Sequence, residues 1–572
     1  MKFKSVCVLV LLCVLWPAKA SADNRFIVRT TLNQQVLQAV CNPPLLPPIC
    51  TVVGGLGDPL GQVFLITSPL DLTDLLNLPG NPLAIVDAEV DQLLSLLPVG
   101  ALNTLPSTSP EYLTPLMSDR TLVPYPNSGG TVWNSYANQP AAQIVRVSDA
   151  QSQFGVTGSG IVADIDTGVD PTHPALQSVL LPGCDFTRNQ PDGSCQPGGS
   201  ELTDISSCPF SSCPPPPCPD CSSAQVNQST AAVLDQSTAA VLDCNGASPC
   251  QYAAFGHGTM VMGVIHLVAP TAQLMPLKTF KSDGTGFLSD ILRAVYYAVG
   301  NNANVINMSF DTQTNSRELK KALNYANQNG IICAASAGNE GQSAPPLTVY
   351  PAEWQYFVMG VASVGSTTAT DSTPSSFSNF GNAIVWVAAP GEAIVSTYPF
   401  GTYAAGWGTS FSAPFVSGGS ALLLNRQANV NEARAARAVA HAVPVGSQMG
   451  HGRLDLVQAL QALGAVPTSD PPPTASIDSP SGTMVILAGQ SVFFSGSGAD
   501  PDGEITAYSW SFPGGDPASS NVATPGNVTY STPGTFVVTF TVADDAGITD
   551  PTPPTRTIIV LPIPCLVLCN PL

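Results

Sequence analysis

The sequence predicts an α/β domain built on a parallel sheet with helices on both faces, preceded by a small α+β unit and followed by an antiparallel β-sandwich. Apolar strand-like runs alternate with helix-length runs between residues 145 and 463. Shorter runs of both kinds lie near the N-terminus. Residues 474–561 instead alternate apolar and polar side chains with a period of two, which is typical of half-buried strands.

The length and net charge of the chain limit the classes of protein to which it could belong. A chain of 572 residues has room for about three or four domains, and its 44% hydrophobic content supports substantial cores. The formal net charge of -20 repels nucleic acid, so we expect no nucleic-acid partner.

Residues 1–22 have the layout of a secretory signal peptide. Lys2 and Lys4 precede an apolar run, and small residues end at Ala22. A membrane anchor is the alternative, but the run is short for a bilayer and no second run of about 18 apolar residues follows it. We therefore expect an exported chain with no membrane span, either extracellular or, in a Gram-negative cell, periplasmic.

The first folded unit follows the signal. Residues 25–30 and 62–66 read as strands, and residues 88–94 as an amphipathic helix. A turn-rich segment covers residues 98–140.

In the central domain, buried strands are expected at residues 160–166, 273–277, 303–309 and 330–336, with helices at 288–299 and 318–328. Helices of this length between strands favour parallel pairing.

Residues 184–250 interrupt this pattern with eight cysteines and a tandem octapeptide, residues 228–235 repeated as 236–243. We interpret them as a surface loop held by disulfides, which suits an oxidising compartment. A zinc site is the disfavoured alternative, with the ligands Cys208, Cys213, Cys218 and Cys221.

The other cysteines of the mature chain form two close pairs, Cys41 with Cys50 and Cys565 with Cys569, for which disulfides are also expected. Cys333 lies alone in an apolar run and is expected to be a buried thiol.

A proline-rich linker at 466–473 leads to the sandwich at 474–561 and a tail at 562–572. Asp500 and Asp502 lie in an Asp-Pro-Asp-Gly turn, with calcium binding as the alternative reading.

Three glycine-flanked polar residues carry the chemistry. Asp166 ends an apolar strand, and His257 lies between two glycines at a helix start. Proline is tolerated only in a first helical turn, so Pro414 predicts a helix that begins near Ser410. A serine in that place is, by itself, more often a helix cap.

Together the three residues suggest acyl transfer. A serine hydroxyl becomes a nucleophile when a histidine takes its proton and a buried carboxylate orients that histidine. Ser410, His257 and Asp166 supply these roles, and the order Asp, His, Ser is one that convergent triads use. Asp-Thr-Gly also occurs in aspartic peptidases, but these need a second such loop, and none with apolar flanks is present.

These motifs, with residues 268–278 and 335–341, resemble a subtilisin-like serine peptidase over residues 145–463. The resemblance implies a secreted endopeptidase that acts on protein or peptide substrates through an acyl-enzyme. It makes Asn339 the oxyanion donor. It assigns substrate binding to Gly284, Thr285, Gly286, Ser309, Phe310, Asp311, Ala337, Gly338 and Val349.

Three residues depart from the family pattern. Asp311 and Val349 stand where glycines are usual beside and beneath the specificity pocket, and Phe415 stands where a histidine is common. A branched Val349 would shorten the pocket, which favours small or medium apolar substrate side chains.

Asp164 lies two residues before Asp166, on the same face of its strand. A second carboxylate there raises one of the two pKa values unless a cation or hydrogen bonds compensate, and the sequence leaves that choice open.

The resemblance extends beyond the catalytic domain at 126–465. Residues 23–125 resemble by position an inhibitory propeptide, which assists folding, blocks the cleft and is removed by the enzyme itself. Residues 474–561 resemble an immunoglobulin-like PKD domain, which implies binding to substrate or a surface, or spacing.

No cofactor is implied for catalysis. The family leaves structural calcium open, with unknown ligands.

The rival interpretation comes from the class of binding proteins. In it the triad serves only self-processing, the propeptide stays bound, and the chain is a scaffold that presents the PKD-like domain.

Overall fold

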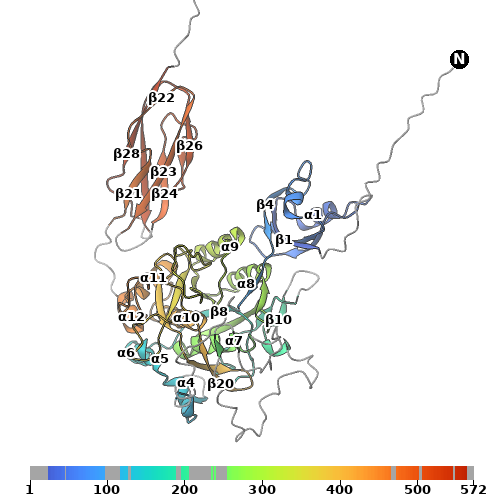
Figure 1. Cartoon of the computed structure of the whole chain (residues 1–572), viewed down its shortest axis with the longest axis vertical. Coiled ribbons are helices and arrows are strands. Elements are labelled where there is room, and N and C mark those ends of the chain that lie inside the picture. The colour runs from blue at the N-terminus through green and yellow to red at the C-terminus, as the bar shows by residue number, and fades with distance from the viewer. Residues whose placement is uncertain are drawn as a thin grey trace, which may run out of the picture. The chain divides into compact units, whose positions relative to one another are not determined.

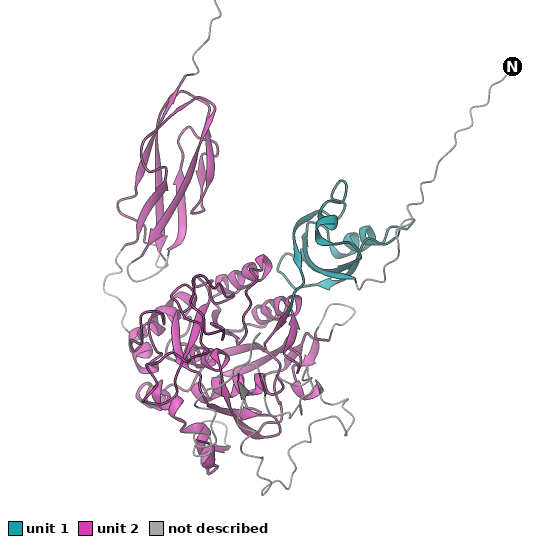
Figure 2. Cartoon of the chain, viewed as in Figure 1, with its two compact units in different colours: residues 1–93, 189–194 teal, residues 94–188, 195–572 magenta. Residues whose placement is uncertain are grey.

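The computed structural model describes residues 23–44, 47–96, 116–125, 130–188, 195–204, 234–235, 238–239, 254–464, 472–500, 505–544 and 548–562. The chain divides into two compact units, residues 1–93 with 189–194 and residues 94–188 with 195–572 (Figures 1 and 2). Across these described ranges, every helix is too short or too polar to span a bilayer. The expected signal peptide lies outside them.

The first unit is a four-stranded antiparallel sheet in the order β2-β3-β1-β4, with two short helices. Asn33 and Asp71 cap the helices by accepting hydrogen bonds from the backbone N–H groups of Val36 and Asp74. The elements are β1 (Asn24–Thr30), α1 (Gln34–Cys41), β2 (Thr51–Gly55), β3 (Val63–Ser68), α2 (Leu72–Leu76) and β4 (Ile85–Val90).

The helix predicted at residues 88–94 is wrong. Residues 85–90 form strand β4, which pairs with β1 so that Val90 lies opposite Phe26 and Ala88 opposite Val28. A short run of apolar and acidic residues fits the period of a helix as well as that of a strand. The strand forms here because the edge of β1 is free to pair with it.

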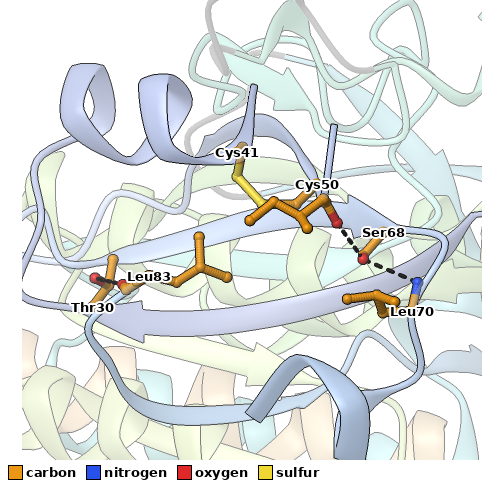
Figure 3. The surroundings of a disulfide bond; sticks show 7 residues. Thr30, Cys41, Cys50, Ser68, Leu70 and Leu83 are labelled. Atoms are coloured by element: carbon orange, nitrogen blue, oxygen red, sulfur yellow. Dashed lines mark hydrogen bonds between the residues drawn. A yellow bond between two sulfur atoms is a disulfide. The ribbon is translucent and has the colours of Figure 1, made fainter. Parts of the chain in front are cut away.

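The predicted disulfide between Cys41 and Cys50 is present (Figure 3). It joins the end of α1 to the residue before β2. Beside it, Ser68 Oγ donates to the backbone oxygen of Ile49 at 2.6 Å and accepts from Leu70 N at 3.1 Å.

The second unit is organised around an eight-stranded sheet in the order β10-β9-β13-β8-β15-β16-β17-β18, parallel except for β10. The four predicted strands are confirmed as β8, β13, β15 and β16. The strands are β8 (Ile161–Asp166), β9 (Gly183–Asp185), β10 (Gln196–Gly198), β13 (Gln273–Lys278), β15 (Val305–Met308), β16 (Ile332–Ser336), β17 (Met359–Val364) and β18 (Val387–Pro390).

Two helix pairs pack on this sheet. Helices α7 (His257–Val268) and α10 (Thr409–Arg426) contact each other and β8. Helices α8 (Leu288–Gly300) and α9 (Arg317–Gln328), both predicted, also contact each other, and they pack on β8 and β16 respectively. The predicted α/β class is therefore confirmed.

Smaller elements complete the domain. They are β5 (Leu93–Ser95), β6 (Leu122–Pro124), β7 (Thr131–Trp133), α4 (Asn134–Ala137), α5 (Pro140–Ile144), α6 (Val147–Phe154), η2 (Glu201–Asp204), β14 (Thr285–Phe287), β19 (Ile394–Tyr398), β20 (Thr402–Trp407), α11 (Glu432–Val439) and α12 (Leu456–Gly464).

Within the cysteine-rich insertion, Cys184 and Cys195 form a disulfide across β9 and β10. The backbone of the octapeptide repeat contributes β11 (Leu234–Asp235) and β12 (Thr238–Ala239), and β11 pairs with β20. The remaining six cysteines, among them the four of the alternative zinc site, lie outside the described residues, as do Cys565 and Cys569. Cys333 is a buried free thiol, as predicted.

Residues 474–561 form the predicted β-sandwich, with one sheet of three strands and one of five. Trp510 is at its centre: it stacks on Phe540 at 4.2 Å between ring centroids and donates from Nε1 to Val522 O. The strands are β21 (Thr474–Ser479), β22 (Met484–Leu487), β23 (Gln490–Ala499), β24 (Ile505–Ser511), β25 (Ser519–Ser520), β26 (Gly526–Tyr530), β27 (Gly534–Asp544) and β28 (Thr555–Leu561).

Candidate active site

The candidate residues gather at the carboxyl ends of the parallel strands. Asp166 is the last residue of β8, Ser309 follows β15, and Asn339 follows β16 in the next loop. Open α/β sheets place ligand sites at this edge because loops from several strands meet there.

Asp166 and His257 are joined by a buried hydrogen bond. His257 Nδ1 lies 2.8 Å from Asp166 Oδ1 and 2.9 Å from Oδ2, and the two residues are 4% and 1% exposed. His257 Nε2 is buried and has no hydrogen-bond partner among the described residues. The carboxylate thus holds the ring through Nδ1, and Nε2 is left able to exchange a proton with another group.

Close backbone packing sets this geometry. Gly258 follows His257 in the first turn of α7, and a Cβ added there would lie 2.0 Å from Gly168 O and 3.1 Å from Asp166 Oδ1. Gly258 N donates to Thr167 Oγ1 at 2.9 Å. Only glycine lets the start of α7 approach the loop after β8 this closely.

Ser410 lies in the first turn of α10, as expected, but Pro414 lies inside the helix rather than in its first turn. Proline lacks an N–H, so the Ser410 carbonyl loses its usual intrahelical donor. Ser309 Oγ donates to that carbonyl at 2.8 Å instead. The missing N–H of Pro414 therefore allows a hydrogen bond that links Ser410 to the end of β15.

The hydroxyl of Ser410 donates to the backbone oxygen of Ser309 at 3.0 Å. The ring of Phe411, the next residue, lies 5.6 Å from the ring of His257. The first turn of α10 therefore lies beside the imidazole.

Asn339 is held against the same helix start. Its Oδ1 accepts from Thr409 N at 2.9 Å and from Thr409 Oγ1 at 3.0 Å. Because Thr409 occupies the amide oxygen, the NH₂ end of the amide is left to donate elsewhere.

Asp164 is 1% exposed on β8 and accepts a hydrogen bond from Asn307 Nδ2 at 2.9 Å. Asn307 Nδ2 also contacts Ser309 Oγ at 3.0 Å, so the bonds run on to Ser410. The question left open by the sequence is thereby answered: burial, with the Asp166 charge second, raises the pKa of Asp164 well above its usual value. Asp164 therefore keeps its proton to a higher pH than a free aspartate does.

The residues assigned to substrate binding lie on two edges. Gly284 precedes β14, which contains Thr285 and Gly286, while Ser309, Phe310 and Asp311 follow β15. Phe280 contacts both: its ring lies 5.4 Å from that of Phe310, and a Cβ on Gly286 would touch it.

The remaining assigned residues surround the loop after β16. Ala337 and Val349 are buried in one apolar cluster, and Gly338 has a φ of 90°. Burial raises the pKa of Asp311 to about 8, and the charge of Glu340 adds to the rise. A Cβ on Gly338 would lie 3.0 Å from Glu340 Oε2 and 3.3 Å from Asp311 Oδ2.

Sequence reasoning missed two buried ionisable residues near the pair. Lys278 lies opposite Asp166 in the register of β13 and β8, and its Nζ donates to the backbone oxygens of Thr167 and Phe280. Glu201, from the cysteine-rich insertion, contacts the start of α7. Lys278 could have been found from the sequence, because it is an ionisable residue at the end of an apolar strand. Nothing local marks Glu201.

Within the described ranges, no three side chains of His, Cys, Asp or Glu converge as metal ligands would. Asp502, half of the alternative calcium turn, lies outside them.

Comparison with known proteins identifies the family. Residues 158–460 match the sequence model of the subtilase family, and the chain belongs to that family. Residues 479–552 match the PKD domain.

Three curated relatives show how far the similarity extends. Subtilisin NAT of Bacillus subtilis subsp. natto is 32% identical over 274 residues, which cover 48% of this chain and 57% of that protein. Subtilisin of Bacillus pumilus is 32% identical over 302 residues, 52% of this chain and 90% of that protein. Thermitase of Thermoactinomyces vulgaris is 31% identical over 307 residues, which cover 53% of this chain and 90% of that protein.

The neutral state of Asp164 predicts a pH-dependent effect of Asp164→Asn on stability. In the unfolded chain this carboxyl ionises above its ordinary pKa of 3.8, while the folded chain keeps the proton. Its contribution is therefore complete below that pH and is lost as the pH rises toward the folded-state pKa. Asparagine has no proton to lose, so the variant should gain relative stability by up to about 1.4 kcal/mol per pH unit above pH 4.

Urea unfolding at pH 4 and pH 7, in chains carrying Ser410→Ala to prevent self-digestion, measures this gain. Asp149→Asn, at an exposed carboxylate, is the control. An Asp164→Asn effect of equal size at both pH values would contradict a neutral Asp164.

Proposed function

We propose that this chain is an exported serine endopeptidase, made as a self-processed zymogen, with Ser410 as nucleophile, His257 as general base and acid, Asp166 as orienting carboxylate and Asn339 in the oxyanion hole. The observation that carries the proposal is the buried bond between His257 Nδ1 and Asp166, with Nε2 left for the serine at the adjacent helix start. The cysteine pairs and membership of the subtilase family support export and peptide-bond hydrolysis.

In the proposed reaction, the Ser410 hydroxyl rotates from the Ser309 carbonyl to His257 Nε2. Oγ attacks the substrate carbonyl as Nε2 takes its proton, and Asp166 stabilises the imidazolium that forms. The N–H of Ser410, at the positive end of α10, and the Asn339 amide stabilise the oxyanion. His257 then protonates the amine as its C–N bond breaks. Water attacks the acyl-enzyme while His257 Nε2 takes its proton, and His257 returns a proton to Ser410 Oγ as the acid product leaves.

The N-terminal region is proposed to act as the inhibitory propeptide. Strand β5 pairs with β14, the strand assigned to substrate binding, and Leu96 N donates to Gly284 O at 2.9 Å. Leu94 and Leu96 are 5% and 8% exposed, so this segment is well packed. A chain segment added to a free strand edge occupies the place of an extended peptide.

The PKD domain is proposed to bind substrate or a surface, or to act as a spacer. Structural calcium stays a proposal that rests on the family resemblance.

Replacing the nucleophile should abolish hydrolysis. We expect Ser410→Ala to lower turnover of labelled casein by about 10⁶-fold, as in a subtilisin without its serine, and to eliminate fluorophosphonate labelling. Wild-type chain that is not labelled, while residues 23–125 stay bound, would contradict the proposal and favour the scaffold. Ser420→Ala, further along α10, is the control for the helix.

Charge on the docked segment should weaken inhibition. In the uncut chain, Leu94→Asp with Leu96→Asp should speed fluorophosphonate labelling of Ser410 by about 10-fold or more, because a buried carboxylate opposes docking. Leu60→Asp is the matched control, since Leu60 is 70% exposed in the same N-terminal region. Equal labelling rates in all three chains would show that the segment does not cover the site.

We further propose that Val349 shortens the specificity pocket. Val349 is fully buried in a cluster with Ala337, which fits a shortened pocket. Digestion of a peptide library should show cleavage after small or medium apolar residues, and a preference for large aromatic residues would refute this.

A further inference from the structure

Glu201 is a buried carboxyl that the reaction scheme above does not use. It is 1% exposed and begins the short helix η2, just after β10. The predicted surface loop at residues 184–250 thus contributes a buried carboxyl group to the protein interior.

The backbone around Glu201 is attached to the loop that follows Asp166. Val169 N donates to Gly199 O at 3.0 Å, and Glu201 N donates to Val169 O at 3.1 Å. A Cβ on Gly168 would lie 2.5 Å from Gly199 O, so the two loops pack without space for a side chain. Cys184 and Cys195 close the hairpin that leads into this contact.

The side chain of Glu201 reaches the start of the histidine helix. Its Oε2 accepts from Gly256 N at 2.7 Å, immediately before His257. Its Oε1 accepts from the hydroxyl of Thr259, whose oxygen in turn accepts from Asp170 N at 2.8 Å. Both carboxyl oxygens therefore act on residues that flank His257.

A third bond joins Glu201 to the aspartate side. Thr167 Oγ1 lies 3.3 Å from Glu201 Oε2 and accepts from Gly258 N at 2.9 Å. Thr167 follows Asp166 directly, so one carboxyl group contacts the residues next to both members of the catalytic pair.

From this geometry we infer that Glu201 is a positioning residue for catalysis, which holds the His257 imidazole against the Asp166 carboxylate by bonding the first turn of α7 to the loop after β8. The inference rests on the proposed function of this site. Glu201 touches no reacting atom, so it acts through His257 and Asp166.

The charge state of Glu201 makes its positioning role measurable as a dependence of turnover on pH. Burial raises the pKa of Glu201 to about 8, despite the hydrogen bonds and the Lys278 charge that favour ionisation. The carboxylate accepts from all three donors, whereas the protonated acid has a donor of its own where an acceptor is needed. The charged or titratable groups that interact with it are Asp164, Asp166, Lys278 and Tyr398, and His257 follows Gly256, the donor to its Oε2.

Ionised Glu201 should therefore hold the pair best. It also adds negative charge beside the imidazolium that forms in the transition state. The turnover of the wild-type enzyme should rise as the pH passes through about 8, and Glu201→Gln, which resembles the protonated acid, should lack that rise.

The test is kcat and KM for a peptide p-nitroanilide that the wild-type enzyme cleaves, measured from pH 6 to 10 on fully processed enzyme. We expect Glu201→Gln to match the wild type within about 3-fold at pH 6.5 and to fall about 10-fold behind it in kcat at pH 9.5, with KM unchanged within about 2-fold, because misplaced catalytic groups lower turnover rather than binding.

Glu432→Gln is the matched control. Glu432 is 2% exposed, and its Oε2 accepts from the backbone N–H of Cys333 at 2.7 Å, which copies the Glu201 bond at a site outside the catalytic machinery. Urea unfolding of both variants in the Ser410→Ala background separates folding from catalysis. We expect both to lose stability but only Glu201→Gln to change the pH profile.

Two outcomes would overturn the inference. If the wild-type chain is active and Glu201→Gln follows its pH profile in parallel, as Glu432→Gln should, Glu201 is only structural and the proposed function stands. If the wild-type chain neither cleaves the anilide nor reacts with a fluorophosphonate, the proposed function fails and this inference fails with it.

Discussion

The hydrogen bond between Asp166 and His257 is the interaction on which the rest of the site depends. It joins the end of β8 to the first residue of α7, two elements that are 91 residues apart at this contact. Away from water such a bond is strong, and without it the buried Asp166 carboxylate would keep the hydrogen bond from Thr167 N at 2.6 Å but lose its bond to the imidazole. The surrounding packing keeps both elements in place: glycines at 168 and 258 let the backbones approach, and Lys278 holds the carbonyl of Thr167.

The nucleophile side uses an irregularity of its helix. Pro414 removes one N–H from α10, and the freed carbonyl of Ser410 is bonded by Ser309 instead. In exchange, the Ser410 hydroxyl donates to the carbonyl of Ser309. Pro414 would weaken an ordinary helix, but here it frees the Ser410 carbonyl for the bond from Ser309. That bond connects Ser410 to the strand edge along which a substrate peptide is proposed to lie.

Buried and half-buried carboxyl groups concentrate around this edge although only 10% of the chain is charged. Burial raises the pKa of Asp164, Glu201 and Asp311, and each lies on or beside a strand end or loop that carries a proposed site residue. Shifted ionisation of this kind is common at functional sites, where polar groups are packed for geometry rather than for hydration. A protonated Asp164 can share one face of β8 with Asp166 without adding a second negative charge there.

The sequence by itself determined the local features. Period-two alternation located Trp510, Phe540 and their strands, and glycine-flanked motifs marked Asp166, His257 and Ser410, because these signals depend only on neighbours along the chain. Tertiary structure alone decided the rest. Residues 85–90 became a strand because β1 offered a free edge, and Glu201 met Gly256 across 55 residues because a disulfide-closed hairpin packs on Gly168. Such contacts arise from chain segments meeting in space, so no local periodicity encodes them.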